Sequence, residues 1–184
     1  MKNKMGKIFI TSDPHFNHGN IIKFCNRPFE NTEEMNKSLI TSWNNLITDE
    51  DEVYILGDFS LGSSKSALYI LSQLNGKKFL VTGNHEKSVL SNNNCRNHFE
   101  WIKDYFELKY DNKYFMLFHY AMRVWNKSHH GSFHLYGHSH DGLDKDGEYN
   151  GLSMDVGVDS AYRILGEYRP FQIDEIIDIM NKRK

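Results

Sequence analysis

The chain has 184 residues, 39% of them hydrophobic, which is enough to bury a core and predicts a single domain over residues 1–184. Its formal net charge is −2, whereas a general nucleic-acid-binding protein is usually basic, so the composition argues against that class and leaves open a local basic patch. No apolar run approaches the roughly 20 residues that span a bilayer, and the two cysteines indicate no disulfide framework. We therefore expect a cytoplasmic protein that does not insert into a membrane.

Short apolar runs alternate with helical patterns in the first half of the chain. The predicted elements are strand 7–12, helix 19–25, helix 31–48, strand 53–56, helix 63–74 and strand 78–82. The longest of these helices has Asn31 as a candidate N-cap, with Glu34 at capping-box spacing. The acidic residues 49–52 are predicted to form a solvated loop. Strands that alternate with helices indicate an α/β fold.

The second half of the chain is predicted to contain more strand and less helix. The predicted elements are a surface loop after a helical turn over 88–98, a hairpin of strands 105–109 and 114–118, a strand at 134–136, a turn-rich loop over 141–151, a strand at 153–158 and a helix that begins at Asp174. Asp155 and Asp159 flank Gly157, and their expected role is to brace a neighbouring site from behind.

Side chains of the metal-binding type follow most of the predicted strands. They are Asp13, His15, Asp58, Asn84, His85, His119, His138 and His140. In extended backbone, residues two apart point the same way, so His138 and His140 can aim their rings into one small volume. Taken alone, Asp13-Pro14 also fits a simple turn. Functional groups collect beyond the carboxyl ends of strands in open α/β folds, and eight such residues suffice for two metal ions if one carboxylate bridges them.

Five motifs in this order resemble those of the calcineurin-like metallophosphoesterase family. They are Asp13-Pro14-His15, Gly57-Asp58, Gly83-Asn84-His85-Glu86, His119 and Gly137-His138-Ser139-His140. They extend from residue 13 to residue 140 and thus over most of the chain, and Pro14 stands at a position that varies in the family. The resemblance implies a four-layer αββα sandwich, in which two mixed β-sheets pack face to face and are flanked by helices.

The resemblance also implies a role for each motif residue. The first metal ion would be held by Asp13, His15, Asp58 and His140, and the second by Asp58, Asn84, His119 and His138, with Asp58 as the bridge. His85 would not be a ligand and would lie near the substrate, to donate a proton or to stabilise charge. A histidine-rich set of nitrogen and oxygen ligands suits two divalent cations, with manganese as the first choice and iron, zinc, nickel and cobalt as alternatives.

The activity that the resemblance implies is hydrolysis of a phosphoester, and a phosphodiester is the first choice. Two cations neutralise the phosphate oxygens and activate a hydroxide that attacks phosphorus, while His85 protonates the leaving oxygen. The alternatives are a phosphomonoesterase, a protein phosphatase, a nuclease of the same fold, and a scaffold without catalytic activity. The complete ligand set argues against the scaffold, and the net negative charge argues mildly against the nuclease.

Three further residues are candidate substrate contacts. His18 follows His15 by three residues, Arg123 follows His119 by four, and Arg27 is a weaker candidate of the same kind. For each, the alternative is an ordinary surface or structural role. The expected partner is a phosphoester substrate, either a small molecule or a nucleotide. A nucleic-acid substrate and the oligomeric state stay open.

Overall fold

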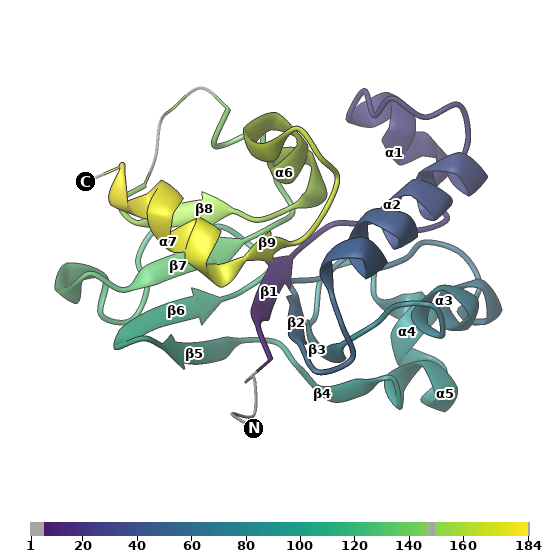
Figure 1. Ribbon diagram of the computed structural model, residues 1–184, viewed down its shortest axis with the longest axis horizontal. Helices are drawn as coiled ribbons and strands as arrows, with labels where there is room; N and C mark the ends of the chain where they lie inside the picture. The colour runs from purple at the N-terminus through teal and green to yellow at the C-terminus, as the bar shows by residue number, and fades with distance from the viewer. Residues whose placement is uncertain (1–5, 146, 148–149, 184) are drawn as a thin grey trace.

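The computed structural model describes residues 6–145, 147 and 150–183 and contains two mixed β-sheets with helices beside them (Figure 1). The larger sheet has the strand order β4-β3-β2-β1-β9, and the smaller sheet has the order β5-β6-β7-β8. The predicted α/β fold of two mixed sheets flanked by helices is therefore confirmed. The single domain over 1–184 stays a prediction, and it includes residues that lie outside the described part of the chain.

The larger sheet brings the ends of its central strands to one edge. Its strands are β1 (Ile8–Thr11), β2 (Glu52–Ile55), β3 (Lys77–Val81), β4 (Phe99–Lys103) and β9 (Phe171–Gln172). β1 to β4 run parallel, whereas β9 is antiparallel to β1. Because carboxyl ends of parallel strands share an edge, Asp13, Asp58 and Asn84 start their loops on the same side of the sheet.

The smaller sheet delivers the remaining motif histidines. Its strands are β5 (Phe106–Tyr110), β6 (Lys113–Leu117), β7 (Phe133–Tyr136) and β8 (Ser153–Asp155). β5 and β6 form the predicted hairpin, and its turn residues Asp111 and Asn112 have φ values of 45° and 59°. β7 is parallel to both β6 and β8, so the loops that carry His119 and His138 leave the sheet at one edge.

The described residues form seven α-helices, of which the first three and the last lie where the sequence predicts them. They are α1 (Gly19–Phe24), α2 (Thr32–Leu46), α3 (Ser64–Leu71), α4 (Lys87–Leu90), α5 (Asn93–Arg96), α6 (Val158–Leu165) and α7 (Ile173–Asn181), with a 3₁₀ turn at Ser128–His130. Asn31 caps α2 by accepting from the backbone N–H of Glu34 at 3.0 Å. The Glu34 carboxylate accepts from the backbone of Glu30, so the capping box is not closed.

Several local predictions differ from the structure. The helical turn expected at the start of 88–98 is present as part of α4, but the rest is not only loop, because a second short helix, α5, forms around the buried Cys95. The predicted strand 153–158 ends at Asp155, and its last residue begins α6. The loop 49–52 is not fully solvated, because the buried Asp51 accepts hydrogen bonds from the backbone of Lys7 and Thr48.

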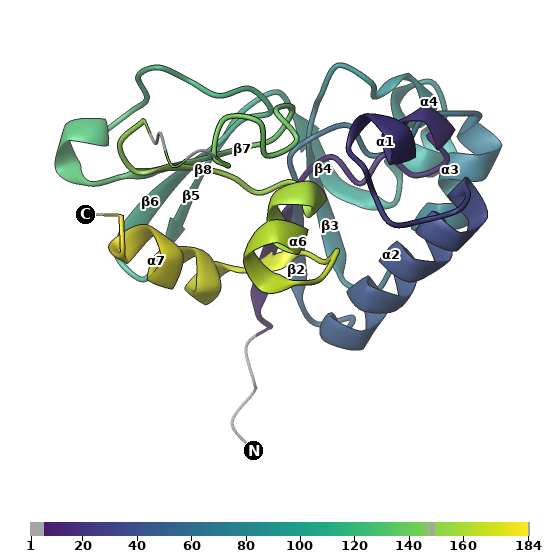
Figure 2. The ribbon, with the colours of Figure 1, turned by 90° about the horizontal axis from the view of Figure 1, so that it is seen from above.

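Two apolar cores lie on opposite faces of the larger sheet. Phe9 packs in one core with side chains of α2, and its neighbour Ile10 packs in the other with the smaller sheet and α7. Figures 1 and 2 both show α2 and α7 on opposite sides of β1 and β2. Strands buried on both faces read as continuous apolar runs, which is why β1 and β2 are evident in the sequence.

Among the described residues, no helix has both the length and the apolar character that crossing a membrane requires. The cytoplasmic location stays a prediction.

Candidate metal centre

The motif loops hold several candidate ligands in strained backbone conformations. Asp13, His15, Asp58, His138 and His140 have φ values of 54°, 50°, 52°, 64° and 47°. The left-handed region costs a residue with a Cβ atom about 1–2 kcal/mol, and such residues concentrate at functional sites. The backbone strain therefore marks the place where the strand ends meet.

Two motif glycines allow the loops to approach each other closely. A Cβ atom at Gly137 would lie 2.0 Å from Ser12 Oγ and 2.2 Å from Asp13 Oδ2, and one at Gly83 would lie 2.4 Å from Asp58 Oδ1. No side chain fits at either position without displacing a carboxylate. The glycines of the motifs are thus required by the spacing of the loops.

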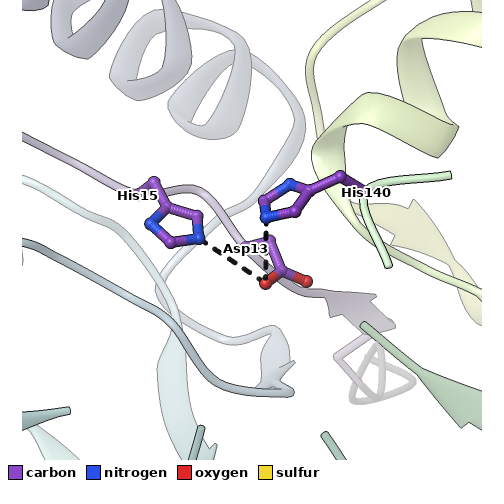
Figure 3. Close-up of side chains that lie close together, drawn as sticks. All are labelled: Asp13, His15 and His140. Carbon is purple, nitrogen blue, oxygen red and sulfur yellow. Dashed lines mark ion pairs between the residues drawn. The ribbon is translucent and has the colours of Figure 1, made fainter. Parts of the chain in front are cut away.

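A first cluster consists of Asp13, His15 and His140, which converge from the loops after β1 and β7 (Figure 3). Asp13 Oδ1 lies 3.7 Å from His15 Nε2 and 4.0 Å from His140 Nε2, too far for hydrogen bonds. Asp13 Oδ1 and His15 Nε2 are both buried and have no hydrogen-bond partner among the described residues. Buried polar atoms rarely stay unsatisfied, and a cation between these atoms would satisfy them.

A second cluster consists of Asp58, His119 and His138, and Asn84 adjoins it. His119 Nε2 lies 3.6 Å from Asp58 Oδ1 and 2.9 Å from Asn84 Oδ1. The other carboxylate oxygen, Asp58 Oδ2, lies 3.5 Å from His15 Nε2 of the first cluster. Asp58 thus faces both clusters, with one oxygen directed at each.

Two of the histidine rings are oriented by hydrogen bonds at Nδ1, while their Nε2 atoms face the other candidate ligands. His119 Nδ1 lies 2.7 Å from the Leu56 carbonyl oxygen, which can only accept, so Nδ1 carries a proton and its hydrogen bond fixes the orientation of the ring. His140 Nδ1 makes the same kind of contact with Asp159 Oδ2 at 2.9 Å. Burial opposes the charged form of His140, but the hydrogen bond to Asp159 raises the pKa of His140 to about 10. A cation bound at Nε2 would displace a proton from this ring.

Arg27 lies behind the first cluster and does not reach the substrate side. Its guanidinium donates two hydrogen bonds to Asp159, at 2.8 and 2.9 Å, and one each to the carbonyl oxygens of Asp13 and Pro14 at 2.9 Å. The side chain is fully buried. The expectation that Arg27 contacts the substrate therefore does not fit the structure, because its donors are turned inward to protein acceptors.

The bracing role expected of the two late aspartates fits their contacts. Asp155 Oδ2 accepts from Ser139 Oγ at 2.5 Å and from the backbone of Asp141 at 3.0 Å, which holds the loop of His138 and His140 in place. Burial opposes ionisation of Asp159, but the hydrogen bonds from His140 and Arg27 lower the pKa of Asp159 to about 2.

Cys25, His140 and Asp159 also lie close enough together to hold an ion. Arg27 already donates to both oxygens of Asp159, and its positive charge disfavours a cation beside them. We therefore assign this group to the brace of His140. No sequence pattern points to Cys25, because a lone cysteine after a short helix carries no ligand spacing.

His85 and His18 line the cavity above both clusters, which has a volume of about 440 Å³. The His85 ring is exposed and lies 5.8 Å from the His15 ring, while its backbone N–H donates to Asp58 Oδ1 at 2.8 Å. His18 Nδ1 lies 3.1 Å from His15 Nδ1, and burial, followed by the charge of His15, lowers the pKa of His18. Both residues lie beside the candidate ligands, where a substrate would meet them.

Arg123 is not brought to this cavity. It is exposed and lines a different cavity, of about 370 Å³, together with Tyr136 and Leu143. Its distance of four residues from His119 in the sequence does not place it in the cavity of the candidate ligands. As a candidate substrate contact, Arg123 therefore has no geometric support.

The chain belongs to the calcineurin-like phosphoesterase family, whose sequence model matches residues 6–178. It is accordingly a hydrolase of phosphoester bonds in a metal-dependent family. It is 36% identical over 183 residues to the uncharacterized protein MJ1445 of Methanocaldococcus jannaschii, covering 98% of this chain and 94% of that one. It is also 33% identical over 85 residues to the Gene 66 protein of Mycobacterium phage L5, covering 45% of this chain and 41% of the relative.

A solved structure shares the fold over nearly the whole chain. It is AQ665 of Aquifex aeolicus, described as a protein of unknown function, and it has a TM-score of 0.72 at 24% sequence identity. The match covers 95% of this chain and 99% of the other. This likeness shows the fold alone.

Proposed function

We propose that this protein is a phosphodiesterase that works with two divalent cations, and the position of Asp58 carries the proposal. One Asp58 oxygen is 3.5 Å from His15 Nε2, and the other is 3.6 Å from His119 Nε2. A carboxylate between two clusters of ligands is suited to bridge two cations and to offset their mutual repulsion. The unsatisfied atoms Asp13 Oδ1 and His15 Nε2 support the fit of a cation in the first cluster.

The proposed ligands follow from this arrangement. The first cation is assigned to Asp13, His15, Asp58 and His140, and the second to Asp58, Asn84, His119 and His138. Mixed nitrogen and oxygen donors suit manganese, our first choice, and also iron, zinc, nickel and cobalt. For His15 to bind through Nε2, its Nδ1–H must donate to His18, which gives His18 a role in orienting the His15 ring.

The chain's own residues bind and protonate the substrate in this proposal. The cations, when bound, supply charge neutralisation for the phosphate oxygens and an activated water. His85 stands at the wall of the cavity, anchored through its backbone to Asp58, and its exposed ring is free to donate a proton to the leaving oxygen. Arg27 and Asp159 hold His140 and the loop of Asp13 in position.

The space around His85 favours a diester over a monoester. Asn84 and His85 line both the cavity above the clusters and a neighbouring cavity of about 550 Å³. A monoester has one organic group to accommodate, whereas a diester has two, and two adjoining cavities provide room for both.

The test compares bis(p-nitrophenyl) phosphate with p-nitrophenyl phosphate, using metal-stripped protein refilled with Mn²⁺. We expect diester hydrolysis that chelator abolishes and Mn²⁺ restores, with two metal ions per chain by elemental analysis. A strong preference for the monoester would contradict the diesterase and indicate a phosphatase. Protein that binds no metal after refilling would contradict the metal centre itself.

A further inference from the structure

The cavity beside His85 differs in chemistry from the one above the metal ligands. Ten described residues line it, and they come from the loop after β2, the start of α3 and the segment that contains α4. Five of them are serines, one is Lys87, and none is acidic. The chain as a whole has a net charge of −2, whereas this cavity beside His85 is lined by a cation and by hydroxyl groups. Its lining is suited to an anionic ligand.

Lys87 gives the cavity its positive charge. The side chain is exposed, and no ion pair among the described residues includes it. Its acidic neighbour Glu86 is buried and directs Oε1 to the backbone N–H of Phe59 at 3.2 Å, so it does not neutralise the ammonium in the cavity. Lys87 is therefore available to an anionic ligand.

The serines provide a fixed wall and free hydroxyl groups. Ser88 Oγ is buried and donates to the Ser60 carbonyl oxygen at 2.7 Å, which ties α4 to the loop after β2. Ser64 Oγ and Ser91 Oγ lie 3.0 Å apart and form an exposed pair. One hydrogen bond between two hydroxyls leaves a donor and several lone pairs unused, and these can bind sugar hydroxyls or phosphate oxygens.

We propose that this cavity binds the leaving group of the diester and that the group is anionic and hydroxylated, as in a phosphorylated sugar of a nucleotide. The inference rests on the proposed function, in which His85 protonates the leaving oxygen. Because His85 lines both cavities, a leaving group that reaches its ring from the metal side extends into the space lined by Lys87. Lys87 then acts as a specificity-determining residue through attraction to the distal anion.

The test uses the dinucleotide TpT and its two phosphorylated forms, pTpT and TpTp. Whichever nucleoside leaves, either pTpT or TpTp carries the extra phosphate on that nucleoside. The products of hydrolysis identify the nucleoside that left. We expect this phosphate to raise kcat/KM by about threefold to tenfold, mainly through KM, because it gains one charge-assisted contact with an exposed lysine. The preference should weaken as salt is added.

Two variants separate the subsite from general electrostatics. Lys87→Ala should abolish the preference for the extra phosphate, measured as the ratio of kcat/KM between the phosphorylated dinucleotide and TpT. Lys65→Ala removes an exposed lysine of α3 that does not line the cavity, and it should retain the preference. A calorimetric titration with thymidine 3′,5′-bisphosphate should show the same dependence on Lys87 without any turnover.

The outcomes distinguish this inference from the proposed function. If bis(p-nitrophenyl) phosphate is hydrolysed but Lys87→Ala keeps the full preference, the subsite is wrong and the phosphodiesterase stands. Equal losses in Lys87→Ala and Lys65→Ala would also overturn the subsite, because they would indicate a long-range charge effect. If the wild-type protein hydrolyses no diester at all, the proposed function fails and the assignment of a leaving-group subsite fails with it.

Discussion

Arg27 and Asp159 are 132 residues apart in the chain and are joined by two hydrogen bonds directly behind His140. Asp159 Oδ2 accepts from both Arg27 and His140, and the same guanidinium binds the carbonyl oxygens of Asp13 and Pro14. One buried ion pair therefore connects the loop after β1 with the loop after β7. These are the two loops that supply the first cluster of candidate ligands.

Asp159→Asn should weaken metal binding, because the variant loses the charge that holds the His140 ring through Nδ1. We expect a tenfold to hundredfold lower affinity for one cation, roughly the range for residues that orient metal ligands. Titration with Co²⁺, followed by its visible absorption, measures this affinity. Asp178→Asn on the exposed face of α7 is the matched control and should bind like the wild type. Unchanged affinity in Asp159→Asn would show that the brace does not act on the metal.

Arg27→Ala should lower the free energy of unfolding by about 3–5 kcal/mol, because the largely buried Asp159 carboxylate loses its cationic partner and two carbonyl groups lose their donor. Urea unfolding monitored by circular dichroism measures the change. Arg123→Ala is the control, since the exposed Arg123 should change stability by no more than about 0.5 kcal/mol. An equal and small effect in both variants would contradict the bracing role of Arg27.

His85→Ala should reduce kcat by about 100-fold to 10,000-fold and leave the metal content unchanged, as expected for a general acid that is not a ligand. The loss should be greater for a diester with an alkyl leaving group than for one that releases p-nitrophenolate, because a good leaving group needs less protonation. Elemental analysis and steady-state kinetics provide both readouts.

His119→Ala is the comparison for His85→Ala. His119 belongs to the second cluster, so its removal should lower metal content and activity together. A loss of metal in His85→Ala, or an equal loss of kcat for both types of leaving group, would contradict the role assigned to His85.

Asp51→Asn should destabilise the fold in a pH-dependent way. Burial opposes ionisation of Asp51, but hydrogen bonds from Thr48 and Lys7 lower its pKa below the ordinary 3.8. A lowered pKa stabilises the fold above pH 3.8, and this contribution is lost as the pH falls through the folded-state pKa. We expect about 1.5–3 kcal/mol of destabilisation at pH 7 and a smaller difference below pH 3.8, measured by urea unfolding. A difference that stays constant with pH would show that the charge is not responsible.

The sequence by itself was sufficient for most of the strands and for the order of the candidate ligands. β1, β2 and β3 are continuous apolar runs because both faces of the larger sheet are buried, and each run ends directly before a motif. The hairpin of β5 and β6 was predictable from its turn residues for a similarly local reason. The edge strands β4 and β9 had no such signal: β4 carries charges on its exposed positions, and β9 has two residues.

The tertiary structure decided the role of residues whose partners are distant in the chain. The sequence predicts Arg27 as a substrate contact, but in the structure its donors bind Asp159 and two carbonyl groups of the loop after β1. Arg123 follows a candidate ligand in sequence but faces another cavity, while Lys87 reaches the cavity beside His85. A local stretch of sequence determines which helix or strand forms and which polar residues follow it. Which side chains then face each other depends on the packing of segments far apart in the chain, and no local pattern specifies that packing.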